Sequence, residues 1–399
     1  MNANHISAVG VKRLLLSHNI FNAGRVFFEI FLSVFIWKVT QDLTLVAWFN
    51  IVYLLVHILA FHGFALLVKR GMIHLPRIVA LLGFALTYLV IFTLQENAVN
   101  YIIPIATIIG FFNGMYWISY QVLRFNLTNR ANRGNYSGLE MGTKTFVSII
   151  MPILGGTIIT ANFFGFGYAN LFLVGSVLFL VSLLVGNVYF PIRNKDGLHT
   201  RKTFVLLWKN PDIRKSMLGH FFGSFSRGGT IIRLVLPLII FEATQNELQL
   251  GGWLSLFSIA AILSSVAFGK LVDYKHYKTW MFSSGVLYTL LIVLIAFFPS
   301  FWMYVLFGAL AQVLTVAIFI PKRTISENLV HTLEDEDSHK VEYIVIREWF
   351  NIGFGRMLSF IILLTVGGLA DEQMRLLLLL MAVAVFAEVS LLRSIKGKI

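Results

Sequence analysis

The chain has 399 residues, of which 57% are apolar and only 13% are charged. A soluble domain carries about 25% charged residues, so this composition excludes a soluble globular protein and predicts one that crosses a membrane several times. Cysteine is absent, which excludes disulfides, cysteine nucleophiles and cysteine metal ligands. The net charge of +13 could suggest a nucleic-acid partner, but the placement of the basic residues favours another cause.

Twelve apolar stretches are long enough to span a bilayer as helices, which takes about 20 residues each. They cover residues 14–37, 43–68, 76–94, 101–122, 138–161, 167–190, 216–242, 250–271, 279–298, 302–321, 343–368 and 372–393. The sequence therefore predicts an all-α integral membrane protein with twelve transmembrane helices. We expect two six-helix bundles, residues 1–192 and 216–399, joined by a cytoplasmic linker over residues 193–215.

The longest connection between predicted spans runs from Pro191 to Lys215 and is polar and basic. It contains a short apolar patch, Thr203–Trp208, set among lysines and arginines. A helix lying on the membrane surface has this pattern. An ordinary linker turn is the alternative, and the sequence leaves both open.

The basic residues predict the orientation in the membrane, because cytoplasmic loops carry an excess of lysine and arginine. Most of them fall in alternate connections, and the opposite side of the membrane holds only Lys38 and Arg375, the latter at the start of the last span. We expect both termini in the cytoplasm of a bacterium and the spans in its inner membrane. Membrane orientation then accounts for the net charge, so we expect membrane lipids as neighbours, no nucleic-acid partner, and a monomer.

One helix-forming stretch occurs once in each half, as Leu15–Phe31 and Met217–Arg233. In each copy a histidine precedes an arginine by seven positions. A Thr-Gln pair and then a tryptophan follow each copy. These residues are His18, Arg25, Thr40, Gln41 and Trp48 in the first half, and His220, Arg227, Thr244, Gln245 and Trp253 in the second. We infer that the two bundles are related by pseudo-twofold symmetry and that each begins with this helix.

Several charged residues fall inside predicted spans, where a charge costs about 2.5–3.5 kcal/mol and normally faces protein or water. Arg25 and Glu29 are four positions apart and share one helix face. The other embedded arginines of interest are Arg227, Arg233 and Arg356. The planar fork of arginine suits phosphate or carboxylate, so these residues predict a basic cavity for an anionic substrate group. The alternative is a network of ion pairs that holds the helices together.

Glu29 is the chief acidic residue that we assign to membrane depth, and we expect it to carry a proton. Burial favours its protonated form, whereas the neighbouring Arg25 favours its charged form. The sequence does not decide between these effects. Because Glu29 can neutralise only one arginine well, we expect Arg227 to lack a counter-charge.

The fourth predicted span carries three residues that could contact a substrate, Asn113, Trp117 and Tyr120. Packing and an interfacial aromatic belt are the alternative. The segment His331–His339 could hold a metal, but we expect a solvated acidic loop there. The sequence has no nucleophile–base pair, phosphate-binding glycine loop or metal-hydrolase spacing. We therefore expect no catalytic residues, no metal, no cofactor and no enzymatic activity.

Several motifs resemble those of the major facilitator superfamily. Gly269–Lys278 (GKLVDYKHYK) resembles the family's G-x-L-x-D-R-x-G-R-K loop, with the second glycine missing. Arg130–Gly138 resembles the basic loop after the fourth helix, and Pro152–Gly156 resembles part of a fifth-helix motif. Lys209–Arg214 resembles a common entry to the seventh helix. The resemblance covers the whole chain and implies the family's fold of two six-helix bundles.

By this resemblance, Gly269, Asp273 and Lys278 form a gating motif that closes the cytoplasmic side when the protein opens outward. Glycine lets two helices approach closely, and an aspartate can accept hydrogen bonds from the start of a neighbouring helix. A solvated turn is the alternative role for Asp273.

The expected function is secondary active transport by alternating access, in which two halves rock around a site at mid-membrane. We favour ion-coupled export of a small organic solute, anionic or amphiphilic, with protons as a candidate coupling ion. The alternatives are a flippase that moves a lipid or lipid-linked headgroup between leaflets, and a sensor of the same fold that does not transport.

Overall fold

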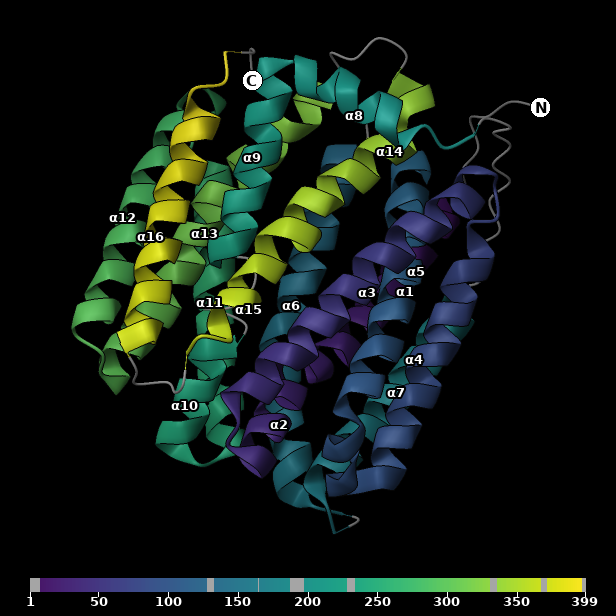
Figure 1. Ribbon diagram of the computed structural model, residues 1–399, viewed down its shortest axis with the longest axis vertical. Coiled ribbons are helices and arrows are strands. Elements are labelled where there is room, and N and C mark those ends of the chain that lie inside the picture. The colour runs from purple at the N-terminus through teal and green to yellow at the C-terminus, as the bar shows by residue number, and fades with distance from the viewer. Residues whose placement is uncertain are drawn as a thin grey trace.

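The computed structural model describes residues 8–127, 133–163, 165–186, 197–227, 234–330, 336–366 and 372–396. In these residues the regular structure is helical, and the long helices run side by side between two ends of the molecule (Figure 1). Large apolar side chains such as Leu59, Leu86 and Val383 are more than half exposed. A lipid environment accounts for such a surface, because a water-soluble monomer rarely exposes contiguous apolar area on this scale.

The first half contains α1 (Ala8–Val26), the π-helix η1 (Phe27–Leu32), α2 (Ser33–Thr40), α3 (Leu43–Lys69), α4 (His74–Leu94), the 3₁₀ helix η2 (Gln95–Tyr101), α5 (Ile102–Leu127), α6 (Arg133–Ala161) and α7 (Gly167–Val185). Then come α8 (Thr200–Lys209), α9 (Pro211–Phe225), α10 (Leu236–Thr244), α11 (Glu247–Leu271), η4 (Tyr274–His276), α12 (Tyr277–Phe297), α13 (Phe301–Val330), α14 (Glu336–Glu348), the π-helix η5 (Trp349–Arg356), α15 (Met357–Leu363) and α16 (Glu372–Arg393).

Nine segments within the described residues are long and apolar enough to cross a membrane. One of them, residues 74–124, holds two consecutive helices, α4 and α5, joined by η2. The segments α9–α10 and α14–η5–α15 have comparable length and carry charges at their centres. These segments together are consistent with the expected twelve spans.

Local sequence fixes several helix starts. Asp42 accepts hydrogen bonds from the backbone N–H groups of Thr44 and Leu45 at the start of α3. Asn210 accepts from two N–H groups at the start of α9, with Pro211 in the first turn. These side chains satisfy donors that a helix start otherwise leaves unpaired.

The repeated Thr-Gln pairs adopt the same geometry in both halves. Gln41 and Gln245 have a left-handed backbone conformation, with φ of 51° and 47°. Each ends its helix, and its backbone N–H donates to the carbonyl four residues earlier. The preceding threonines, Thr40 and Thr244, bond the carbonyl four residues earlier. The sequence repeat therefore corresponds to a structural repeat at the ends of α2 and α10.

The two halves meet mainly along two pairs of helices, α3 with α15 and α6 with α11. On the second pair the backbones come very close: a Cβ on Gly156 would lie 2.4 Å from the Glu247 carbonyl oxygen. A Cβ on Gly251 would lie 2.2 Å from the Pro152 carbonyl oxygen. The glycines therefore permit this approach, as small residues do between membrane helices.

In Figure 1, α1 begins and α16 ends at one end of the molecule, which also carries α8. We call this end the terminal face; the opposite face carries α2 and α10. Hydrogen bonds tie the start of α9 to the end of α16, from Lys215 to the Ser394 carbonyl and from the Lys396 N–H to Asp212. The predicted linker, residues 193–215, thus reaches the terminal face in its described part, residues 197–215.

Candidate functional site

Arg25 and Glu29 form an ion pair near the middle of the first span. The Arg25 Nη1 lies 2.5 Å from the Glu29 Oε1, and its Nε donates to the Asn22 side chain at 3.3 Å. The guanidinium carbon lies 5.3 Å from the centre of the Trp117 ring on α5, within range of a cation–π contact. The four-residue spacing that the sequence showed therefore produces a direct contact.

A second buried ion cluster joins three helices of the other half. Glu388 on α16 is fully buried and accepts hydrogen bonds from both Nε and Nη2 of Arg227, at 3.1 and 2.6 Å. Lys322 on α13 donates to the same carboxylate at 2.9 Å. Gly223 on α9 leaves room for this cluster, because a Cβ there would lie 2.2 Å from the Glu388 Oε1. Two cations thus share one anion.

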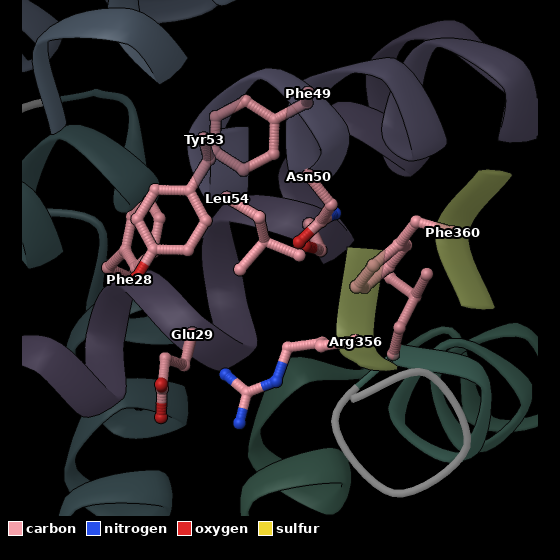
Figure 2. A pocket seen from close by; sticks show the side chains of 10 residues that line it. Phe28, Glu29, Phe49, Asn50, Tyr53, Leu54, Arg356 and Phe360 are labelled. Atoms are coloured by element: carbon pink, nitrogen blue, oxygen red, sulfur yellow. The ribbon is translucent and has the colours of Figure 1, made fainter. Parts of the chain in front are cut away.

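A small cavity lies between the halves at the level of Glu29. Its walls come from η1, α2, α3, η5, α15 and Leu234, which lies two residues before α10. The lining residues are Phe28, Glu29, Ser33, Phe49, Asn50, Tyr53, Leu54, Leu234, Arg356 and Phe360. Figure 2 shows the Glu29 and Arg356 side chains projecting into the same space. The volume of about 30 Å³ suits a water molecule or two. Any larger solute requires the halves to separate.

The backbone around these arginines departs from the ordinary α-helix. Arg25 comes two residues before η1, Arg227 is itself π-helical, and Arg356 is the last residue of η5. π-helical turns occur mostly as single bulges inside α-helices, frequently at functional sites. The three described arginines that the sequence singled out thus share an unusual local geometry.

At the opposite face, hydrogen bonds and an ion pair close the space between the halves. The Trp37 indole donates to Glu242 at 3.0 Å, and Lys38 lies 2.6 Å from Glu247. Tyr168 on α7 donates to the same Glu247 at 3.1 Å.

At the terminal face a second set of contacts joins the halves. Lys69 lies 2.6 Å from the fully buried Glu342, which also accepts a hydrogen bond from the backbone N–H of His199 in the linker. Arg347 donates to Gln121 at 2.6 Å. The halves therefore contact one another at both faces, on either side of the level of the central cavity.

Glu140 on α6 is the centre of a further polar cluster on the terminal side. It accepts a hydrogen bond from Tyr120 at 2.7 Å and lies 3.2 Å from Arg124. Arg323 of the other half lies 3.7 Å from it, and His18 lies 4.0 Å from it. This cluster therefore links the two halves through α5, α6 and α13.

Comparison with known proteins decides the family. The family model for the Major Facilitator Superfamily matches residues 14–321, which is most of the chain. The chain belongs to the Major Facilitator Superfamily. This is a family of membrane transporters, and the predicted resemblance and fold class are confirmed.

Similar proteins extend the comparison. "Uncharacterized protein YqgE" of Bacillus subtilis (strain 168) is 23% identical over 369 residues, covering 91% of this chain and 84% of that protein. "Uncharacterized protein in sodM 3'region" of Geobacillus stearothermophilus is 26% identical over 147 residues, covering 36% of this chain and 67% of that protein.

Two solved structures share the fold. A bacterial homologue of the iron transporter ferroportin, in an inward-facing state, superposes with a TM-score of 0.68 at 14% identity, covering 96% of this chain and 97% of that one. A bacterial metal transporter superposes with a TM-score of 0.64 at 13% identity, covering 98% and 99%. At this identity the likeness concerns the fold alone.

The structure brings together some of the candidate binding residues and separates others. Glu29 and Arg356 line the central cavity, and Arg25 and Trp117 contact one another beside it. Asn113 instead bonds the buried ring of His57 at 2.7 Å. Tyr120 stacks on His18 at 3.5 Å between ring centres and bonds Glu140, so the structure uses it in packing. Arg233 lies outside the described residues.

One expectation about Arg227 is wrong, because Glu388 supplies its counter-charge. Glu388 is also a second acidic residue at depth, where the sequence analysis named chiefly Glu29. Lys322, which directly follows the tenth predicted span, residues 302–321, lies buried against Glu388 in α13. The sequence did carry a signal for Glu388, since it is the only charged residue between Arg375 and Arg393 of α16. Its partner could not be inferred, because 161 positions separate it from Arg227.

The proposed gating motif lies between α11 and α12 at the terminal face. Gly269 falls near the end of α11, and Asp273 is exposed and accepts a hydrogen bond from the Lys275 N–H at 3.1 Å. Lys278 donates to the Ile395 carbonyl at 2.6 Å after the end of α16. In this conformation Asp273 therefore stabilises its own turn, and its gating role stays a prediction.

Proposed function

We propose that this transporter exports a small organic anion with an aromatic or amphiphilic body, in exchange for protons, by alternating access. The observation that carries the proposal is that Glu29 of the first half and Arg356 of the second line one cavity between the halves. A site of this kind changes shape whenever the halves move relative to one another, as alternating access requires.

The wall chemistry supports an anion that carries an apolar group. Phe28, Phe49, Tyr53 and Phe360 provide aromatic surface. Arg356 provides a planar guanidinium that can donate two parallel hydrogen bonds to a carboxylate or phosphate. In a mostly apolar pocket, a small number of polar groups is enough to fix the orientation of a ligand.

Glu29 suits the role of proton carrier because it occupies the cavity wall and pairs with Arg25. An anionic substrate that binds Arg25 competes with Glu29 for the same guanidinium. The Arg25–Glu29 pair is therefore the point at which the substrate and the proton act on one site, the substrate on the cation and the proton on the anion.

The transport cycle follows from the closures at the two faces. Residues 1–192 and 216–399 rock as two bundles about the linker, residues 193–215. The contacts of Lys38 with Glu247 and of Lys69 with Glu342 break in turn. The motif at Gly269, Asp273 and Lys278 closes the terminal face, which lies on the cytoplasmic side of the bacterial inner membrane. The working unit is a monomer.

The metal named for the two similar structures is not carried over to this protein. In the described part of the chain, no three His, Asp or Glu side chains gather closely enough to hold a metal ion. Because the two similar structures are of proteins named for iron or metal transport, iron is nevertheless included in the experiment as a rival substrate.

The experiment uses purified protein reconstituted into liposomes. A thermal-shift screen of aromatic carboxylates and phosphates first selects a ligand, and uptake of that ligand is then measured with the interior acidic, alkaline or at equal pH. We expect uptake to be fastest with an acidic interior, because protons leave as the substrate enters. Arg356→Gln should reduce uptake at least tenfold, whereas Arg375→Gln, which alters an exposed arginine of α16, should not.

Three results would overturn the proposal. The first is uptake of metal ions but of no organic anion. The second is movement of labelled lipid between leaflets without uptake of any soluble anion. The third is uptake that is insensitive both to the pH difference and to Arg356→Gln.

A further inference from the structure

A second cavity lies away from the central one, between α4 and α7 on the terminal side. Its volume is about 200 Å³, and its lining includes His74, Arg77, Leu183, Leu184 and Gly186. The Leu184 side chain is 78% exposed, so the cavity borders the apolar outer surface. The α4 and α7 helices do not line the central cavity, and the proposed function does not use this site.

Arg77 is the chemical centre of this cavity. Its side chain is buried, with 4% relative exposure. One of its terminal nitrogens, Nη2, donates to the Ser17 hydroxyl at 2.8 Å, whereas its Nε is buried without a hydrogen-bond partner. Among the described residues no carboxylate forms an ion pair with this guanidinium. A buried charge without a counter-charge is costly, so an external anion at this point would be stabilised.

The position of Arg77 in the molecule indicates which kind of anion would bind there. Arg77 lies in the first turn of α4, at the terminal face, where headgroups of the adjoining leaflet lie. Leucine side chains form the outer walls and suit acyl chains, whereas the guanidinium at the inner end suits a phosphate. Gly186 allows this arrangement, because a Cβ there would lie 1.7 Å from the Arg77 Nη2.

We propose that this cavity binds the phosphate of an anionic phospholipid from the leaflet at the terminal face, with Arg77 as its main ligand. Ser17 also bonds Ser182 of α7 at 3.0 Å, so Arg77 joins a network that spans α1, α4 and α7. A bound lipid completes this network and stabilises the packing of the first half.

The test titrates detergent-purified protein with short-chain phosphatidylglycerol, phosphatidylcholine or inorganic phosphate and follows the melting temperature. Phosphatidylglycerol should raise the melting temperature of the unaltered protein. Arg77→Gln should require at least about tenfold more lipid for the same shift, since a charge-assisted hydrogen bond is worth about 1.5–3 kcal/mol. The control Arg70→Gln removes a nearby exposed arginine and should respond like the unaltered protein.

A second variant distinguishes the loss of a lipid site from a general loss of stability in Arg77→Gln. Leu183→Trp keeps the arginine and fills the cavity, so it too should lose the lipid response while transport of the central substrate continues. An equal response to inorganic phosphate would refute the lipid assignment, and an equal response to phosphatidylcholine would refute the requirement for an anion. A normal lipid response in Arg77→Gln would refute the site itself.

Discussion

Removing the Glu388 carboxylate should destabilise the protein more than most single substitutions. In the folded chain this side chain is fully buried and accepts hydrogen bonds from both Arg227 and Lys322. Glu388→Gln removes the only negative charge of the cluster and leaves two buried cations facing one another. Breaking a buried ion pair on one side costs about 3–5 kcal/mol. That is a large share of the roughly 5–15 kcal/mol that holds a typical protein folded.

The assay is thermal unfolding in detergent, followed by tryptophan fluorescence. The matched control is Glu372→Gln, which alters an exposed residue at the start of the same helix and should leave the melting temperature unchanged. A triple variant, Glu388→Leu with Arg227→Leu and Lys322→Met, removes every charge together. It should melt well above Glu388→Gln, because a buried ionic cluster can often be replaced by apolar residues without loss.

Two outcomes would refute this reasoning. An unchanged melting temperature in Glu388→Gln would show that water or another group compensates the cations. A triple variant that melts as low as the single one would show that side-chain shape, and not charge pairing, determines the stability of this cluster.

Three further predictions concern gating, packing and topology. Asp273→Asn should leave the melting temperature unchanged and reduce transport; normal turnover at normal expression would leave only its role in the turn. Gly156→Ala should lower the melting temperature, because the added Cβ meets the Glu247 carbonyl oxygen at 2.4 Å, whereas Gly142→Ala on the same helix meets nothing and serves as control. Tags at either terminus or within residues 193–215 should react only from the cytoplasm, and a C-terminal tag labelled from outside would contradict the twelve-span topology.

The fold was predictable from the sequence because its main signals are local. Stretches of apolar residues indicate spans directly, and the Thr40-Gln41 pair recurs as Thr244-Gln245 with the same left-handed glutamine. The Arg25–Glu29 contact was predictable for the same reason, since four positions place both residues on one helix face.

The composition of the central cavity could not be predicted in full. Phe49, Asn50 and Tyr53 on α3 form much of its wall, yet in the sequence they are ordinary residues of an apolar span. Their role depends on how α3 rotates against η1 and α15, which no local pattern records. Tyr120 is the opposite case. The sequence suggested that it contacts a substrate, but in the structure it stacks on His18 and bonds Glu140, which lie on other helices.

Arg25 and Arg227 occupy equivalent positions in the two halves, but they have different partners. This difference suits them to different roles, one in substrate binding and one in stability. Arg25 pairs with a residue of its own helix, Glu29, which also lines the cavity. In the proposed function, a substrate can therefore compete with Glu29 for Arg25 without breaking an ion pair between helices. Arg227 pairs with Glu388 on a different helix, and Lys322 holds the same carboxylate from a third. Releasing Arg227 would leave the fully buried Glu388 carboxylate with Lys322 alone and weaken a cluster that joins three helices. Under the proposed function, the first half thus carries the ion pair that exchanges partners, and the second half provides the stable cluster against which it does so.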